Sequence, residues 1–92
     1  MIKSFRNKNT ETFCTGGAVR QFQSVPVKVL ARKLTQLDSA GVLGDLRVPP
    51  GNKLEALQGD RKGQHSIRVN DQWRLCFVWD DGVTELELVD YH

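Results

Sequence analysis

The chain has 92 residues, 39% of them hydrophobic, and a formal net charge of +2, which suits a single domain over residues 1–92 and excludes a disordered segment. Its apolar runs are too short to cross a bilayer, and the charged residues 1–6 lack the apolar stretch of a secretory signal, so we expect a cytoplasmic protein with no membrane partner. Cys14 and Cys76 show no CxxC spacing and no neighbouring histidine, so we expect free thiols, no metal and no other cofactor.

The N-terminal quarter predicts a short strand followed by a short helix. Residues 1–5 have the composition of a strand. Residues 7–15 form the helix, with Asn7 or Asn9 available as its N-cap and two glycines, at 16 and 17, ending it.

A longer second helix is the clearest element of the sequence. Pro26 suits its first turn, and glycines at 41 and 44 end it. Five apolar residues recur at helical spacing and predict its core-facing stripe: Val27, Leu30, Ala31, Leu34 and Leu37. The remaining face is expected to be exposed to solvent, and contact with RNA is the alternative. It carries Lys28, Arg32, Lys33 and Gln36.

Beyond a loop at residues 45–52 the apolar pattern changes from helical to alternating. Four strands are predicted, over residues 53–57, 65–69, 73–79 and 83–89. Their short links, including the hairpin signal Asp80-Asp81-Gly82, make consecutive strands antiparallel. The sequence therefore predicts an α+β domain in which two N-terminal helices pack on one face of a mostly antiparallel β-sheet. The second face remains free to bind a partner.

The charges are unevenly distributed along the chain. Residues 1–79 carry 13 basic and 6 acidic side chains, a balance of +7, whereas residues 80–92 carry 5 acidic side chains and no Lys or Arg. A basic body is typical of a surface that binds phosphate groups. A mixed-charge, solvated surface without a partner is an equally weighted alternative from composition alone.

Alternation along the strands places Arg68 and Arg74 on one sheet face, joined by Arg61 and Lys62 from the preceding loop. A guanidinium group can hold a phosphate with two hydrogen bonds and stabilise the charge that develops on it during transfer. The alternative for any one of these arginines is a salt bridge across the sheet to Glu85, Glu87 or Asp90.

The last residues of the sequence carry proton-transfer groups. Tyr91 and His92 directly follow the last strand, which can bring them to the edge of the basic face. Terminal residues usually fray, so an inert end is the alternative. Because RNA supplies its own nucleophile, the 2′-hydroxyl, an enzyme that positions phosphate and moves protons needs no metal.

Several motifs make the whole chain resemble the HigB toxins, a branch of the RelE/ParE superfamily of type II toxin–antitoxin systems. The motifs are Leu57-x-Gly59-Asp60-Arg61-x-Gly63, Ser66-Ile67-x-Val69, Trp73-Arg74 and the ending Asp90-Tyr91-His92. The resemblance implies a toxin that cleaves mRNA in the ribosomal A site as a metal-independent endoribonuclease, and so halts translation and growth. It also implies a HigA-like helix-turn-helix antitoxin as partner, which links the complex to operator DNA.

The resemblance also implies roles for individual residues. Four match positions tied to activity: Arg74 for the scissile phosphate, Tyr91 and His92 for proton transfer and nucleotide stacking, and Asp90 as an orienting group or proton acceptor. Contacts to the RNA backbone are expected from Arg61, Lys62, Arg68 and Lys53.

Two positions depart from the best-studied HigB pattern. Glu55 and Gln58 stand where a histidine and a lysine are expected, so an altered proton relay is predicted, with Glu55 as a possible base. His65 is a second relay candidate, although a core-side strand position beside Ile67 is favoured for it.

Two other functions remain open from the sequence. One is a toxin that inhibits DNA gyrase without catalysis, as in the ParE branch, against which the Tyr91-His92 ending argues. The other is a ribosome- or RNA-binding module that leaves RNA intact, which the departures at Glu55 and Gln58 favour.

Overall fold

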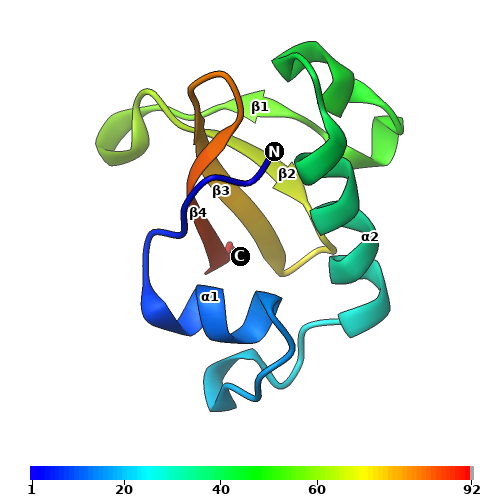
Figure 1. Ribbon diagram of the computed structural model, residues 1–92, viewed down its shortest axis with the longest axis vertical. Helices are drawn as coiled ribbons and strands as arrows, with labels where there is room; N and C mark the ends of the chain where they lie inside the picture. The colour runs from blue at the N-terminus through cyan, green and yellow to red at the C-terminus, as the bar shows by residue number, and fades with distance from the viewer. Residues whose placement is uncertain (92) are drawn as a thin grey trace.

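An antiparallel sheet with strand order β1-β2-β3-β4 lies at the centre of the structure, a computed structural model that describes residues 1–91 (Figure 1). Its strands are β1 (Glu55–Ala56), β2 (His65–Arg68), β3 (Trp73–Trp79) and β4 (Val83–Asp90). The helices are α1 (Lys8–Cys14) and α2 (Val27–Ser39), with short 3₁₀ turns η1 (Arg20–Phe22), η2 (Leu43–Arg47), η3 (Pro50–Asn52) and η4 (Gly59–Arg61). The predicted α+β arrangement of two helices and an antiparallel sheet is confirmed.

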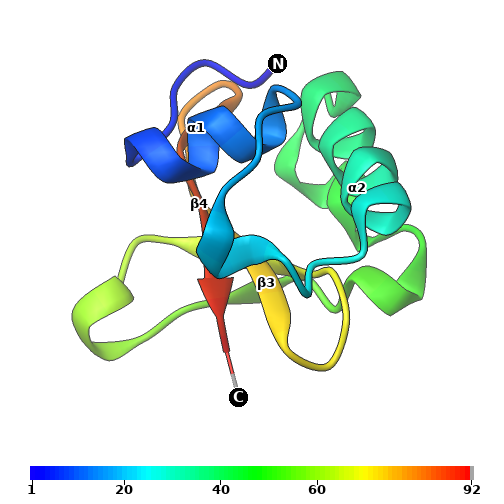
Figure 2. The same ribbon diagram turned by 90° about the horizontal axis from the view of Figure 1, so that it is seen from below.

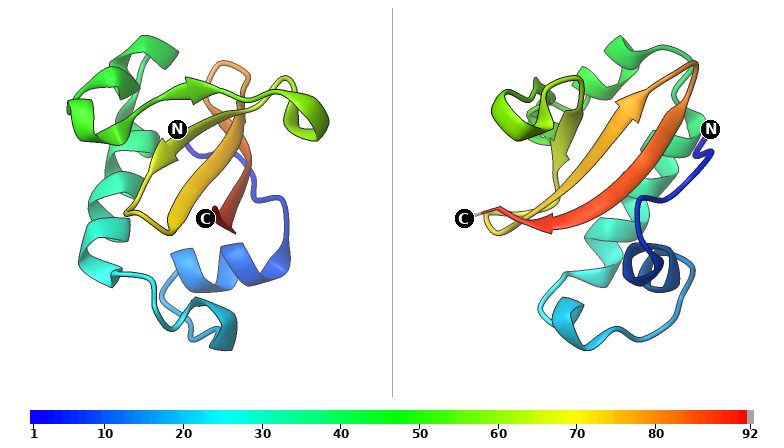
Figure 3. Two further views of the ribbon diagram at one scale, coloured as in Figure 1. Left: turned by 180° about the vertical axis from the view of Figure 1, so that it is seen from behind. Right: turned by 90° about the vertical axis from the view of Figure 1, so that its left-hand side faces the viewer.

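Both helices lie on the same side of the sheet. Figures 2 and 3 show α1 and α2 on that side, with the sheet curving away from them, while the opposite face is left to the loop around β1 and η4. In these 91 residues no helix is long and apolar enough to cross a bilayer. The helix-free face is the one on which the sequence predicted the arginines.

The predicted first strand exists only as two isolated parallel bridges to β4. Ile2 pairs with Val83 and Phe5 pairs with Leu86. The pairing is interrupted because β4 contains a bulge at Glu85, where φ is +51° and the register with β3 shifts. The Ser4 hydroxyl accepts a hydrogen bond from the Glu85 amide at 2.9 Å, so the bulged backbone is still satisfied.

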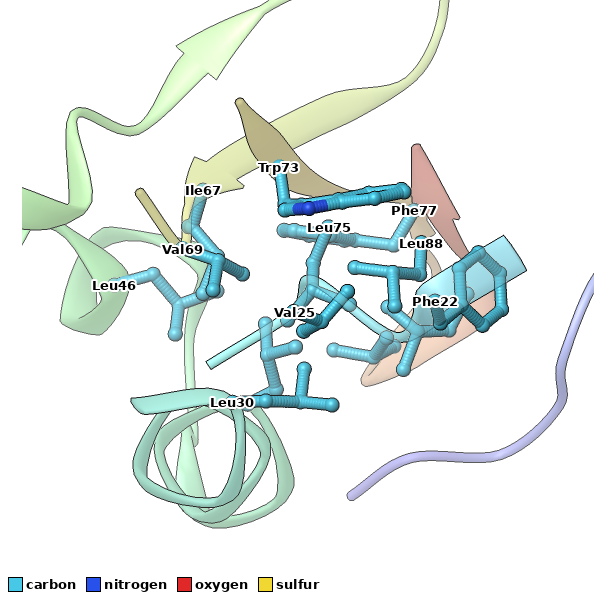
Figure 4. Packing of buried hydrophobic residues seen from close by; sticks show 13 residues of the cluster. Phe22, Val25, Leu30, Leu46, Ile67, Val69, Trp73, Leu75, Phe77 and Leu88 are labelled. Atoms are coloured by element: carbon cyan, nitrogen blue, oxygen red, sulfur yellow. The ribbon is translucent and has the colours of Figure 1, made fainter. Parts of the chain in front are cut away.

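The core fills the space between α2 and the apolar face of the sheet (Figure 4). Trp73, Leu75 and Phe77 alternate along β3 and are at most 4% exposed. The Phe22 ring meets the Trp73 ring edge-on, with their centroids 5.6 Å apart. Each odd-numbered residue of β3 up to 77 thus anchors the sheet to the helices, and the even-numbered residues point to the other face.

Helix α1 covers the free edge of β4. The Asn7 side chain caps the helix by accepting a hydrogen bond from the Thr10 amide at 2.9 Å, one of the two caps that the sequence offered. Thr10 is fully buried, and its hydroxyl accepts a hydrogen bond from the Leu88 amide at 3.2 Å. A side chain of α1 therefore replaces the next strand that β4 lacks there.

The predicted apolar stripe of α2 is partly wrong. Leu30 and Leu37 are buried and Leu34 packs against the core, but Val27 is 64% exposed and Ala31 lies on the solvent side. Val29, which the prediction left out, packs against the core, so the core-facing side of the helix is formed by Val29, Leu30, Leu34 and Leu37. The predicted start after Pro26 is confirmed.

Asn52 joins α2 to the loop that precedes β1. It is fully buried, and its amide nitrogen donates to Gln36 Oε1 at 2.9 Å and to the Leu46 carbonyl at 3.0 Å. Its Oδ1 accepts a hydrogen bond from Lys33 Nζ at 2.5 Å. Lys33 and Gln36, which the sequence assigned to the solvent-exposed face, therefore connect α2 to the loop through Asn52.

The strand predicted over residues 53–57 shrinks to two residues. Lys53 adopts a left-handed conformation with φ of +46°, which turns the chain immediately before β1. The loop at 45–52 contains η2 and η3, whose local turns the composition did not reveal.

Replacing Asn52 tests the importance of this buried network. Asn52→Ala leaves the Leu46 carbonyl and the Gln36 side chain without their donor, so we expect a loss of about 2–4 kcal/mol in the free energy of unfolding. Asn9→Ala is the control, because Asn9 is exposed and makes one hydrogen bond, to Gln21. It should cost about 0.5 kcal/mol or less in urea unfolding. Equal losses would contradict the role of Asn52.

Candidate functional site

Arg74 lies in β3 on the helix-free face, and its guanidinium group is held from two sides. Nε donates to the hydroxyl of Ser66 on β2 at 2.9 Å, and Nη2 donates to the Lys53 carbonyl at 2.8 Å. Nη2 also lies 3.5 Å from Oε1 of Glu55, forming a salt bridge. The Arg74 side chain is only 12% exposed, so its position is set by the protein rather than by solvent.

Tyr91 places its ring against this guanidinium group. Arg74 Cζ lies 5.5 Å from the ring centroid, a cation–π arrangement. The Tyr91 amide donates to the Gln72 carbonyl at 2.6 Å, which extends the pairing beyond β4. Tyr91 is 43% exposed and so presents an aromatic surface to a ligand.

Arg61 reaches the same face from η4. Its Nη1 donates to Oε1 of Glu87 on β4 at 2.9 Å and to Oε1 of Gln64 at 3.1 Å. Glu87 also forms a salt bridge with Arg6, whose Nε lies 3.5 Å from Oε1. The hydrogen bond with Glu87 raises the pKa of Arg61 against the opposing effect of burial, and the negative charge of Glu87 adds to the rise.

Cys76 forms the buried floor of the face, between Ser66 and Glu87 in the strand register. Burial raises the pKa of its thiol, and burial raises the pKa of the Cys14 thiol in α1 to about 11. Both cysteines are free, as predicted, and both thiols are protonated at neutral pH.

Arg68 lies on the same face as Arg74, as the alternation predicted, and the strand register places it directly opposite Arg74. Its guanidinium group turns to Asp71 rather than toward the Arg74 cluster. The salt bridges of these two arginines are thus made with Asp71 and Glu55. Among the acidic residues suggested from the sequence, Glu87 pairs with Arg61 instead.

Asp90 pairs with Trp73 across the ladder, which places it on the helix side of the sheet, at the end of β4. Its Oδ2 accepts a hydrogen bond from Gln72 Nε2 at 3.2 Å. The structure therefore does not bring Asp90 onto the face that holds Arg74 and Tyr91. His92 lies outside the described residues.

Of the two relay candidates, only Glu55 is brought to Arg74. His65 lies on the opposite face, where its ring stacks on Phe77 with centroids 6.3 Å apart, which agrees with the favoured core-side position. Its Nδ1 is buried without a hydrogen-bond partner in residues 1–91. His65 and Arg47 line a cavity of about 190 Å³ on that side of the sheet.

Lys53 and Lys62 are exposed next to the cluster. Lys53 contributes its carbonyl to Arg74, and Lys62 directly follows Arg61 at the end of η4. Both ammonium groups are available at the rim of the face. Across the described part of the chain, no group of three or more His, Cys, Asp or Glu side chains is arranged to hold a metal ion, and the absence of a metal stays a prediction.

Two polar partners in the site were missed from the sequence, Ser66 and Gln64. Ser66 lies two residues before Arg68 in the same strand, so alternation puts both on one face, and this is the signal that identifies Ser66. The Lys53 carbonyl has no such signal, because its direction depends on the left-handed backbone at that residue.

The salt bridges of Glu87 with Arg61 and Arg6 predict that Glu87 contributes more to stability than its neighbour Glu85. Glu87→Ala removes the partner of Arg61 and Arg6 at a site where Glu87 is 19% exposed, and should cost about 1–2 kcal/mol in the free energy of unfolding. Glu85→Ala is the matched control, since Glu85 is 56% exposed and 4.0 Å from Arg6. It should cost about 0.5 kcal/mol or less in urea unfolding at low salt. A larger loss for Glu85→Ala would contradict this assignment.

The chain is similar to known proteins along its whole length. Residues 3–92 match the family of the RelE-like toxin of type II toxin–antitoxin system HigB. Toxin HigB-1 of Vibrio cholerae serotype O1 is 42% identical over 95 residues, covering all of this chain and 98% of that protein. Endoribonuclease HigB of Proteus vulgaris is 33% identical over 93 residues, covering both chains completely.

A solved structure shows the same fold. The YoeB-YefM complex from Staphylococcus aureus superimposes with a TM-score of 0.62 at 19% identity, covering all of this chain and 98% of that one. The fold is therefore RelE/YoeB-like, and the identities to the two HigB proteins decide the branch. The chain belongs to the HigB family of RelE-like toxins of type II toxin–antitoxin systems.

Proposed function

We propose that this single-domain toxin is a metal-independent endoribonuclease that cleaves mRNA in the ribosomal A site and so inhibits translation and growth. The observation that carries the proposal is a guanidinium group fixed on an open sheet face with an exposed tyrosine stacked against it. The likeness to a protein called endoribonuclease HigB supports it.

Arg74 is suited to the scissile phosphate. Its Nε and Nη2 are bound to the protein, while Nη1 has no hydrogen-bond partner in residues 1–91 and is available to a phosphate oxygen. A fixed cation stabilises the negative charge that develops on the phosphate in the transition state without having to reorganise. Arg61 adds a second positive charge on the same face.

The reaction exchanges one bond to phosphorus for another, and the catalytic groups of the protein have to move two protons. The 2′-oxygen attacks phosphorus, its proton passes to a base, and the bond from phosphorus to the 5′-oxygen breaks as that oxygen receives a proton. The products are a 2′,3′-cyclic phosphate and a 5′-hydroxyl. We assign the base to Glu55, whose carboxylate lies beside Arg74, and the acid to Tyr91 or His92.

The remaining predicted residues take supporting roles. Asp90 holds the end of β4 through Gln72, which fits the orienting role better than proton acceptance. Lys53, Lys62 and Arg68 contact the RNA backbone at the rim of the face. His65 lies on the opposite face, so the proposed relay does not pass through it.

Membership of a type II toxin–antitoxin family implies a cognate antitoxin. We propose a HigA-like helix-turn-helix protein, through which the complex reaches operator DNA. The other partners are the ribosome and mRNA, and the site of action is the cytoplasm. One solved structure of the same fold is a complex of YoeB with YefM.

Ribosomes translating a defined mRNA provide the direct test. We expect the wild-type protein to produce cuts within the A-site codon, mapped by primer extension, and Arg74→Ala to lower cleavage by about 100-fold because the fixed charge is lost. His92→Ala should also lower cleavage. Lys28→Ala is the control, because Lys28 is exposed on α2, on the other side of the sheet.

Two results would overturn this proposal. Intact mRNA with the wild-type protein favours the RNA-binding module, which the departures from the HigB pattern at Glu55 and Gln58 support. Inhibition of DNA supercoiling at stoichiometric protein favours a gyrase inhibitor.

RNA binding gives a separate prediction for the rim lysines. Lys62→Gln should reduce the slope of log affinity against log salt by about 0.7, the value for one lost contact to a single-stranded phosphate. Lys28→Gln should leave the slope unchanged. Fluorescence anisotropy with a short labelled RNA measures both, and equal slopes for the two variants would remove Lys62 from the interface.

A further inference from the structure

The Ser66 hydroxyl is buried beneath the helix-free face and accepts a hydrogen bond from Arg74. We propose that Ser66 is a positioning residue for RNA cleavage: it fixes the rotation of the Arg74 guanidinium group so that one edge faces the phosphate. This inference rests on the proposed function. Ser66 is fully buried and does not itself reach a ligand, so it acts only through Arg74.

A guanidinium group is planar and has two edges that each present two N–H donors. On Arg74 the edge formed by Nε and Nη2 is bound by the Ser66 hydroxyl and the Lys53 carbonyl, at 2.9 and 2.8 Å. Two acceptors on one edge fix both the position and the tilt of the plane. The edge that includes Nη1 is then the one presented outward.

Both acceptors belong to rigid parts of the fold. Ser66 is paired on both sides, with Glu55 of β1 and Cys76 of β3. The Lys53 amide donates to the Pro50 carbonyl at 3.1 Å, and its neighbour Asn52 is anchored to α2. Neither acceptor can follow Arg74 if the side chain rotates.

Glu55 attracts the Arg74 guanidinium group, and the hydrogen bond to Ser66 opposes its rotation toward that carboxylate. The Glu55 carboxylate lies 3.5 Å from Nη2 and is 51% exposed, so it can move with the side chain that it attracts. Without Ser66, the Nε donor has no fixed partner and the guanidinium group is free to turn toward Glu55. The carboxylate that serves as the base while Arg74 is held in place would then occupy the edge that includes Nη1 and compete with the phosphate.

Three substitutions at this position separate positioning from packing. Ser66→Ala removes the acceptor, Ser66→Cys fills the space with a weak acceptor, and Ser66→Thr retains a hydroxyl. We expect kcat for A-site cleavage to fall about 10-fold or more in the first two, with KM changed less than about twofold. Ser66→Thr should retain at least half of the activity. Thermal unfolding, compared among the three, shows which variants keep their fold.

Two further measurements test whether Ser66 acts through Arg74. In an Arg74→Lys background no Nε donor exists, so Ser66→Ala should cause no additional loss of cleavage. In ¹H–¹⁵N NMR spectra of the free protein, the Arg74 Nε–H signal should be visible and slow to exchange in the wild type. The signal should be broadened or lost in Ser66→Ala and Ser66→Cys.

The outcomes distinguish this inference from the proposed function. An unchanged Nε–H signal in Ser66→Ala, or an equal loss of cleavage in the Arg74→Lys background, would overturn the positioning role. A wild-type protein that cleaves nothing, together with the expected loss of the signal, would overturn the nuclease proposal and leave the fixed guanidinium group established. If Ser66→Thr unfolds, the Ser66→Cys variant and the NMR signal still decide.

Discussion

The alternation of side chains along β3 is the constraint on which both the core and the site depend. Trp73, Leu75 and Phe77 face the helices and are buried, so the strand cannot rotate or slip without exposing them. The same backbone then directs Arg74 and Cys76 to the opposite face. The apolar half of the strand thereby sets where the guanidinium group lies, and the energy of core packing is what holds a charged side chain in a partly buried position.

A second connection runs from α2 to the site through polar groups. Asn52 binds Lys33 and Gln36 on α2, and the next residue, Lys53, supplies the carbonyl that Arg74 uses. Desolvation by burial lowers the pKa of Lys33, and Arg32 and Arg68 lower it further through their positive charges. The helix that packs on one side of the sheet therefore also steadies a loop whose backbone faces the other side.

The sequence was informative where periodicity decided the outcome and uninformative where single backbone angles did. The bounds of β3 and the shared face of Arg68 and Arg74 followed from alternation, and the hairpin after β3 followed from its turn residues. The family resemblance agrees with the comparisons. The left-handed residues Lys53 and Glu85 were not predictable, because neither is a glycine and each conformation depends on surrounding tertiary contacts. Predicting that Asp90 lies on the helix side required the register after the bulge, which composition does not give.

The contact between residues 2–5 and residues 83–86 has a consequence for how the protein is made. Segments about 80 positions apart are direct neighbours, and β4 sits between β3 and the beginning of the chain. During synthesis, residues 2–5 leave the exit tunnel long before residues 83–86 have been made. The apolar faces of α1 and α2 therefore stay exposed until β4 can pack against them. A nascent chain that stalls before the hairpin at residues 80–82 therefore lacks a complete core, and it also lacks β4, the strand that positions Tyr91. Folding of the toxin therefore has to wait until β4 is available to pair with both β3 and residues 2–5.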